Sequence, residues 1–303
     1  MYGIGRTRTL EITTKIGCKP NMCEYCPQKT LMHNYETQNP THMTLEVFKK
    51  CLKTVPSHID IHFTGYVEPF LNPKCTDMIL HAHQKGHKIS INTTLMGMKK
   101  THLDRICHIT FKNFSVHLPS RTYKEKIGWY GKSITKDGFT ITLSPKWLDL
   151  LNYVISKDIQ PGKRFHCHGR LHQQLVDLGY GKSLKVNETG LQSRIQNVGN
   201  FNINNERDPK NKLPKHLSPR AKCIRVYHNV LLPSGQVQLC CQDYGLEMKI
   251  GNLLEMSYQE MHDTKLFQDI LVNGHDMCDY CDNAIIDYNK KDSWENWRKK
   301  DET

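Results

Sequence analysis

Hydrophobic residues in the first two-thirds of the chain alternate between the spacing of strands and the spacing of helices. Residues 9–15 alternate apolar and polar side chains, which predicts a strand. Residues 44–55 carry apolar side chains at helical spacing after Thr44, a favourable N-cap residue. The same patterns recur and predict strands at 58–65, 87–95, 114–118 and 164–169, and helices at 75–86, 100–107 and 144–157.

Strands separated by helices of this length indicate right-handed βαβ units, a parallel sheet and the α/β class. In such sheets and barrels, ligands bind at the C-terminal ends of the strands. Gly65 ends the second predicted strand, Thr93 and Thr94 lie late in the third, and His117 lies late in the fourth. We therefore expect these residues along one rim, beside the segment that follows the first strand.

The pattern changes near residue 204. Residues 204–222 are polar and contain three prolines, so we expect a linker there. A hairpin around Ser234 and Gly235 and a helix at 257–271 are predicted beyond it, before a polar tail at 289–303. The predicted organisation is a domain at 1–203, the linker at 204–222 and a smaller α+β domain at 223–303.

Composition narrows the functional classes. No run of about eighteen apolar residues or signal peptide is present, so we expect no membrane partner and a cytoplasmic location where thiols stay reduced. Twelve cysteines in such a chain indicate metal or redox chemistry before disulfides. The net charge of +12 permits contact with nucleic acid, but the basic residues are scattered without a Lys/Arg block, which disfavours that partner.

Three cysteines lie within nine residues, directly after the first predicted strand. Cys18 and Cys23 have four residues between them, whereas Cys23 and Cys26 have two. Three thiolates on a 4Fe–4S cluster leave one iron open to an outside ligand. A zinc site completed by a distant histidine is the alternative, because thiolates suit either metal.

These cysteines and the strands that follow resemble the radical S-adenosylmethionine superfamily. The segment "CKPNMCEYC" has the family's two-residue last gap and an aromatic residue before the third cysteine, and "FTGYVEPFLNP" resembles its Gly-Gly-Glu-Pro motif. The resemblance implies a partial (β/α)6 TIM-like barrel, a 4Fe–4S cluster on Cys18, Cys23 and Cys26, and S-adenosylmethionine as cofactor. The cofactor-binding residues that it implies are Tyr25 near the adenine, Glu68 at the methionine amino group with Gly65 of the same motif, Asn92, Thr93 and Thr94 at the carboxylate or ribose, and His117 in place of a serine.

Two features depart from the family pattern. The first cysteine gap is four residues instead of three, so the loop must bulge by one residue. Tyr66 and Val67 also replace small residues of the glycine motif, and we expect both side chains to point away from the cofactor.

Residues 221–281 contain a second cysteine pattern, which runs through a single cysteine, a hairpin, a cysteine pair and a Cys-x-x-Cys. The pattern resembles the SPASM or twitch module, which holds an auxiliary 4Fe–4S cluster after a radical barrel. A zinc ribbon is the alternative. Residues 191–200 also resemble a stretch between the two modules of some members. The implied cluster ligands are Cys223, Cys240, Cys278 and Cys281, with Cys241 as the alternative to Cys240, because strand neighbours face opposite ways.

The other cysteines have simpler interpretations. We expect Cys51, Cys75 and Cys107 to be small buried side chains on helices. Cys167 is expected to pack in its strand, although three histidines flank it, and Arg170 is a candidate for reaching a substrate or the adenosyl group. The flanking histidines are His166, His168 and His172.

The resemblance implies a radical enzyme that oxidises, dehydrogenates or modifies a peptide, a protein or a small molecule, with an electron donor such as flavodoxin or ferredoxin. The first predicted strand begins near Thr9, which favours a small molecule or a protein loop over a leader-guided peptide. A basic zinc protein that binds nucleic acid and a radical enzyme that modifies RNA are the alternatives.

Overall fold

The computed structural model of the chain describes residues 8–18, 22–23, 25–122, 125–126, 130–135, 138–189, 209–212 and 223–281. The expected linker at 204–222 lies outside these residues except for 209–212, as do the stretch 191–200 and the tail 289–303. No helix in the described part of the chain is long and apolar enough to cross a membrane.

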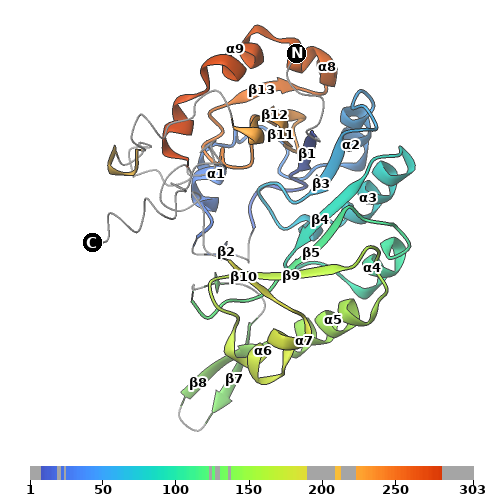
Figure 1. Ribbon diagram of the computed structural model, residues 1–303, viewed down its shortest axis with the longest axis vertical. Coiled ribbons are helices and arrows are strands. Elements are labelled where there is room, and N and C mark those ends of the chain that lie inside the picture. The colour runs from blue at the N-terminus through green and yellow to red at the C-terminus, as the bar shows by residue number, and fades with distance from the viewer. Residues whose placement is uncertain are drawn as a thin grey trace, which may run out of the picture.

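A nine-stranded sheet organises the structure (Figure 1), and its first six strands follow the order of a partial (β/α)6 barrel. Strands β10, β9, β5, β4, β3 and β1 lie side by side and are all parallel. Within the described residues the sheet does not close, which confirms the predicted α/β class and the partial barrel. The bounds are β1 (Thr9–Ile12), β3 (Asp60–Phe63), β4 (Ile89–Thr93), β5 (Asn113–His117), β9 (Lys163–His168) and β10 (Asn187–Thr189).

Helices cover the outer face of these strands, and α2 to α5 follow one another along it in Figure 1. Thr44 begins α2 as predicted, because its Oγ1 accepts the Val47 N–H at 3.1 Å. The predicted helices are confirmed as α2 (Leu45–Leu52), α3 (Cys75–Gln84), α4 (Lys100–Ile106) and α5 (Pro145–Ser156), and short helices α6 (Gln173–Asp177) and α7 (Tyr180–Ser183) precede β10.

Side-chain alternation along the strands separates the apolar core from a polar interior. In β3, Ile61 and Phe63 are fully buried under the helices, whereas His62 between them is partly exposed. In β9, Phe165 and Cys167 are buried, and His166 and His168 face the opposite side. The inner surface of the partial barrel is therefore polar at the strand ends where ligands bind.

The C-terminal region extends the same sheet. Strand β11 (His228–Leu231) pairs with β1 in parallel, and the hairpin to β12 (Gln236–Gln238) and β13 (Lys249–Asn252) continues it antiparallel. Gly235 occupies the predicted turn with φ of +83°. One hydrophobic core consequently includes residues from both regions, such as Phe48 of α2 and Phe267 of α9 (Lys265–Asn273).

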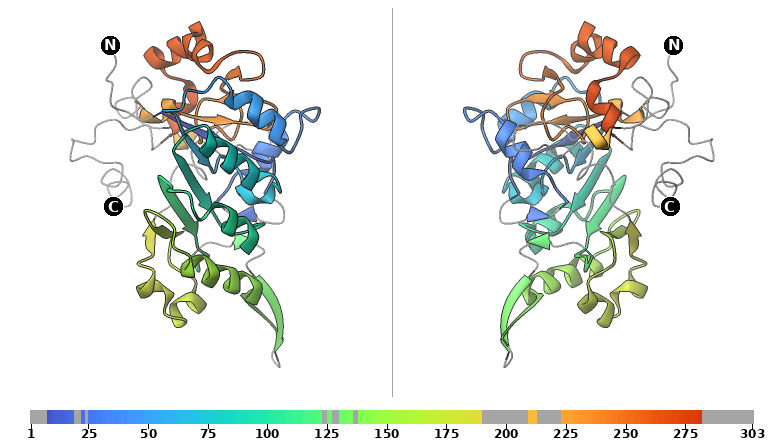
Figure 2. Two further views of the ribbon diagram at one scale, coloured as in Figure 1. Left: turned by 90° about the vertical axis from the view of Figure 1, so that its right-hand side faces the viewer. Right: turned by 90° about the vertical axis from the view of Figure 1, so that its left-hand side faces the viewer.

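Two features differ from the sequence expectations. The helix expected at 257–271 is two helices, α8 (Tyr258–Asp263) and α9 (Lys265–Asn273), because Thr264 is extended and its Oγ1 caps α9 through the Phe267 N–H. The hairpin β7 (Tyr130–Thr135) to β8 (Gly138–Leu143) was not predicted. Figure 2 shows this hairpin, in green, projecting from the end of the molecule opposite α8 and α9.

Candidate radical cofactor site

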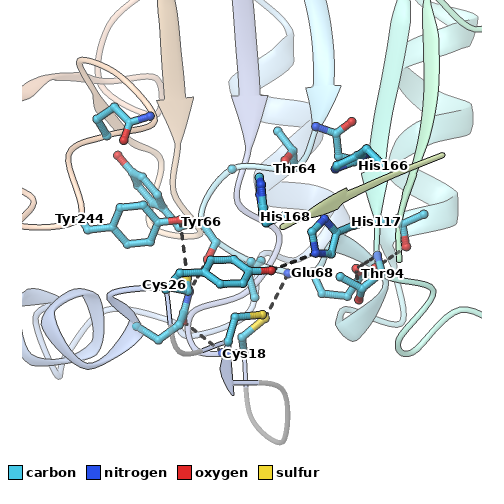
Figure 3. Close-up of a pocket in the computed structure, with 18 of the residues that line it drawn as sticks. Cys18, Cys26, Thr64, Tyr66, Glu68, Thr94, His117, His166, His168 and Tyr244 are labelled. Atoms are coloured by element: carbon cyan, nitrogen blue, oxygen red, sulfur yellow. Dashed lines mark hydrogen bonds between the residues drawn. The ribbon is translucent and has the colours of Figure 1, made fainter. Parts of the chain in front are cut away.

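A hollow of about 360 Å³ opens at the C-terminal ends of the barrel strands (Figure 3). It is large enough for a cofactor-sized ligand. Every N-terminal site residue expected from the sequence lines it: Cys18, Cys23, Tyr25, Cys26, Gly65, Glu68, Asn92, Thr93, Thr94 and His117. The remaining lining residues are Gln28, Thr64, Tyr66, Val67, His166, His168, Thr189, Arg225, Gln242 and Tyr244.

Hydrogen bonds to sulfur hold the cysteine loop in place. The Glu68 N–H donates to Cys18 Sγ at 3.3 Å, and Gln28 Nε2 donates to Cys26 Sγ at 3.4 Å. Gln28 lies at the start of α1 (Gln28–Asn34), and its Oε1 also accepts the Cys18 N–H at 3.2 Å. One buried amide therefore ties both ends of the loop together.

The donor set of this loop fits a thiolate-bound iron–sulfur cluster. Burial raises the pKa of the Cys18 thiol to about 12, so metal loading at neutral pH must displace its proton. The N–H groups already aimed at sulfur would stabilise the resulting thiolates. Within the described residues, no three His, Cys, Asp or Glu side chains surround one point as metal ligands, so the ligand assignment stays a prediction.

Gly65 brings the second strand end against the first. Its φ is +52°, and a Cβ atom there would lie 2.2 Å from Thr13 Oγ1 and 2.9 Å from Thr13 N. Glycine satisfies both the positive φ and the close approach of Thr13. Other residues disfavour positive φ, and their Cβ atom would clash with the Thr13 backbone, which cannot move aside. The sharp turn that follows places Glu68 over the hollow, at the N-cap of the 3-10 helix η1 (Pro69–Leu71).

Glu68 is a buried and fully hydrogen-bonded carboxyl group. Its Oε1 accepts from Thr93 Oγ1 at 2.8 Å and from the Phe70 N–H at 3.2 Å. Its Oε2 accepts from the Thr94 N–H at 2.6 Å and from Thr94 Oγ1 at 2.8 Å. These hydrogen bonds lower the pKa of Glu68, but burial has the larger effect and raises that pKa to about 7.

Aromatic and imidazole side chains form another part of the lining. The Tyr25 hydroxyl lies 2.9 Å from His117 Nε2, and the His117 ring lies 4.9 Å from the rings of both His166 and His168. His166 Nδ1 is 3.1 Å from Ser115 Oγ. Burial, and secondarily His117, lowers the pKa of His166 to about 4, so this imidazole is neutral at physiological pH.

The second cysteine set lies in and beside the hydrophobic core. Cys240, Cys278 and Cys281 are buried in one hydrophobic cluster, with Cys223 packed against it, whereas Cys241 belongs to a separate cluster. Burial raises the pKa of Cys240 well above its ordinary value, and neighbouring Cys241 and Cys281 add to the effect. Cys241 instead lies 3.7 Å from Arg225 Nη1, on the side of the hollow.

The remaining cysteines, Arg170 and the two residues after Gly65 differ in burial and in their contact with the hollow. Cys51, Cys75 and Cys167 are fully buried, whereas Cys107 is partly exposed at the end of α4. Arg170 is exposed and does not line the hollow. Tyr66 and Val67 are buried and contribute to the lining, and the Tyr66 hydroxyl is directed to the C-terminal region, where it donates to the Cys240 carbonyl at 2.8 Å.

Sequence reasoning did not identify the lining residues Gln28, His166, His168, Arg225, Gln242 and Tyr244. Strand alternation around Cys167 could have identified the two histidines, because a buried cysteine directs both of its strand neighbours to the other face. No comparable signal marks Gln28 or Tyr244, which reach the hollow through tertiary packing.

Comparison with known proteins supports both halves of this arrangement. Residues 223–283 match the SPASM family, described as an iron–sulfur cluster-binding domain. A structure of BtrN in complex with AdoMet and 2-DOIA aligns with a TM-score of 0.57 at 14% identity, over 95% of this chain and 98% of that chain. No curated protein matches the chain by sequence.

Two further solved structures share the fold. Native anSMEcpe with bound AdoMet and Cp18Cys peptide aligns with a TM-score of 0.53 at 14% identity, over 90% of this chain and 85% of that chain. SuiB of Streptococcus suis bound to precursor peptide SuiA aligns with a TM-score of 0.53 at 13% identity, over 88% and 67% of the two chains. The SPASM domain and the partial-barrel fold expected from the sequence are therefore confirmed.

Proposed function

We propose that this chain, which carries a SPASM domain on the fold of the radical S-adenosylmethionine enzymes, uses a 5′-deoxyadenosyl radical to abstract hydrogen from a C–H bond of its substrate. One observation carries the proposal. Three thiols, the glycine turn, a carboxyl group and the residues of the next two strand ends all line one hollow. A structural role for each residue alone would not bring ten predicted positions to a single cavity.

In this function, Cys18, Cys23 and Cys26 hold a 4Fe–4S cluster, and Glu68 binds the amino group of S-adenosylmethionine. When bound, these groups supply the reducing electron and the adenosyl radical. The chain itself positions the cofactor: Tyr25 and His117, already hydrogen-bonded, form the adenine side of the hollow. Asn92, Thr93 and Thr94 offer amide and hydroxyl groups for the carboxylate or ribose.

The hydrogen bonds of Glu68 determine how an ammonium can bind there. A carboxylate has about four lone-pair directions, and the chain uses four. An incoming ammonium must therefore displace or share one of these bonds. Thr94 supplies two of them and lies at the end of β4, so exchange of its hydroxyl with the ammonium is the expected adjustment.

We further propose that the SPASM domain holds an auxiliary 4Fe–4S cluster on Cys223, Cys240, Cys278 and Cys281. Cys240 is preferred to Cys241 because Cys281 of the Cys-x-x-Cys lies near enough to raise the pKa of the Cys240 thiol, whereas Cys241 packs in a different group of buried side chains. The buried setting of the four thiols suits such a cluster. The auxiliary cluster would accept electrons from the substrate if the reaction is an oxidation. An electron donor such as flavodoxin or ferredoxin would supply electrons to the first cluster.

The substrate is proposed to be a peptide, a protein side chain or a small molecule. SuiB and anSMEcpe were solved with peptides, whereas BtrN was solved with 2-DOIA. The hollow is lined by polar groups, including three imidazoles and Arg225, which suits a hydrogen-bonding substrate. A cytoplasmic location is proposed with this function, because a reducing compartment keeps cysteines available as cluster ligands.

Metal content and cofactor binding test the proposal. The anaerobically reconstituted chain is expected to contain iron and sulfide and to bind S-adenosylmethionine. A Cys18/Cys23/Cys26→Ala variant should lose the first cluster and the binding while retaining auxiliary iron, and Cys51→Ala serves as a control outside the hollow. Zinc without iron, together with steep salt-dependent binding of nucleic acid, would instead support a basic binding protein.

A further inference from the structure

The two cysteine regions are joined by a continuous set of buried contacts that the cofactor site does not require. Gln28 is 1% exposed and contacts both ends of the N-terminal cysteine loop. Its Nε2 also donates to the Tyr66 carbonyl at 2.5 Å. The loop is therefore fixed to the glycine turn through one amide side chain.

Tyr66 extends this connection to the SPASM domain. Its side chain is 1% exposed, and its hydroxyl donates to the carbonyl of Cys240 at 2.8 Å, across 174 residues of sequence. The backbone of the same residue is fixed at the other end, because the Tyr66 N–H donates to Thr13 Oγ1 at 3.1 Å. A predicted auxiliary ligand is thus hydrogen-bonded to the loop that carries Glu68.

Tyr244 closes the connection on the other side. Its ring packs against the Tyr66 ring with centroids 4.7 Å apart and an interplanar angle of 56°. Its hydroxyl oxygen lies 3.8 Å from Cys26 Sγ, so the contacts return to the N-terminal cysteines. Figure 3 shows Tyr66, Tyr244 and Cys26 following one another along this side of the cavity.

We propose that Gln28, Tyr66 and Tyr244 are positioning residues that couple the two predicted cluster sites, so that the auxiliary loop at Cys240 sets the geometry of Cys26 and thereby the affinity for S-adenosylmethionine. The identity of the bound groups rests on the proposed function. The coupling itself rests on the contacts: one route from Cys26 runs through Gln28 and one through Tyr244, and both meet at Tyr66, which bonds to Cys240. Packed interiors transmit such displacements because they contain few voids.

A double-mutant cycle on the reconstituted full chain tests this coupling. Cys278→Ser opens the auxiliary site, and Tyr66→Phe removes the hydroxyl bond to Cys240 while keeping the ring. In the native background, Cys278→Ser should weaken S-adenosylmethionine binding about fivefold and shift the EPR g values of the reduced N-terminal cluster. In the Tyr66→Phe background, Cys278→Ser should weaken S-adenosylmethionine binding by less than about twofold and should cause no further shift of the EPR g values.

Tyr35→Phe provides a matched control. The Tyr35 side chain is also buried, and its hydroxyl donates to the Pro40 carbonyl at 2.9 Å and lies beside Ser234, but it makes no hydrogen bond to a cysteine. In the Tyr35→Phe background, Cys278→Ser should weaken S-adenosylmethionine binding about fivefold, as expected for the native chain. The coupling would be overturned if Cys278→Ser weakened S-adenosylmethionine binding equally in all three backgrounds, or weakened it in none.

A metal-free measurement separates this inference from the proposed function. In the metal-free chain, Tyr66→Phe should raise the rate at which iodoacetamide alkylates Cys26 by about threefold, because it frees the ring from the Cys240 carbonyl and so loosens its packing on Tyr244 beside Cys26. Tyr35→Phe should leave the rate unchanged. A rate unaffected by Tyr66→Phe would refute the coupling even if the chain binds S-adenosylmethionine. Coupled alkylation in a chain that binds no S-adenosylmethionine would refute only the function.

Discussion

Glu68 shows at the scale of one residue how burial and hydrogen bonding compete. Four donors favour its carboxylate, yet desolvation is larger and leaves its pKa near 7. An ammonium requires the ionised form, which is dominant only above that pH. The site is therefore expected to respond to pH within the physiological range.

We predict that S-adenosylmethionine affinity falls by up to about tenfold between pH 8 and pH 6, since the ionised fraction of Glu68 falls by that factor. Isothermal titration across this range measures it. The folded pKa is above the unfolded one, so in the cofactor-free chain this group favours folding below about pH 4.5 and loses that contribution as the pH rises through 7. Glu68→Gln should bind weakly with a flat pH profile; a flat profile in the native chain would contradict the assignment.

Gly65 is the second residue whose role follows from geometry. We predict that Gly65→Ala lowers the free energy of unfolding by roughly 3 kcal/mol, because positive φ and the contact with the Thr13 backbone act together. Gly179→Ala is a matched control, since Gly179 has φ of +80° but no atom within 4 Å of its Cβ position. It should lose only roughly 1 kcal/mol in urea denaturation. Equal losses would mean that strain alone explains Gly65.

At the scale of elements, strand alternation explains which neighbouring side chains act together. It places His166 and His168 at the hollow with Cys167 behind them. Cys240 and Cys241 lie beyond the end of β12 and belong to separate clusters. The positions of β1, β3, β4 and β5 and of the helices between them could be predicted because their periodicity is strong and their caps are local. The break at Thr264 could not, since a continuous apolar period across it concealed the cap.

The cysteine pair gives a prediction at this scale. Cys240→Ser should reduce the iron content of the reconstituted chain from about eight to about four atoms, whereas Cys241→Ser should leave it near eight. Iron analysis with EPR of the remaining cluster measures the difference. Loss of iron in Cys241→Ser alone would reverse the assignment of the fourth ligand.

At the scale of the whole molecule, the sheet joins two regions that the sequence separates. The sequence predicts two domains and a linker, and in the structure β11 of the second region pairs with β1 of the first. The Tyr258 N–H of α8 also donates to Thr54 Oγ1, in the turn after α2, at 3.2 Å. Sequence patterns report local periodicity and cannot reveal such pairing across two hundred residues. The cysteine, glycine and threonine motifs of the hollow were predictable because each lies at a strand end, whereas Gln28 and Tyr244 depend on this long-range assembly.

Because the core is shared, we predict one cooperative unfolding transition for the metal-free chain. Hydrogen exchange during urea denaturation should show β1 and β11 amides losing protection at the same midpoint, since unpairing either strand exposes the other. The β7–β8 hairpin, which projects from the body, serves as an internal comparison and should exchange earlier. Separate midpoints for the two strands would indicate independent domains.

Formation of 5′-deoxyadenosine tests the central claim most directly. The reconstituted chain would be reduced with dithionite, supplied with S-adenosylmethionine and compared with Cys26→Ser and Cys51→Ser variants, the latter altering a buried thiol outside the hollow. The account predicts 5′-deoxyadenosine from the native chain and from Cys51→Ser, and none from Cys26→Ser. Absence of the product from an iron-loaded native chain, or equal product from Cys26→Ser, would contradict a radical function at this site.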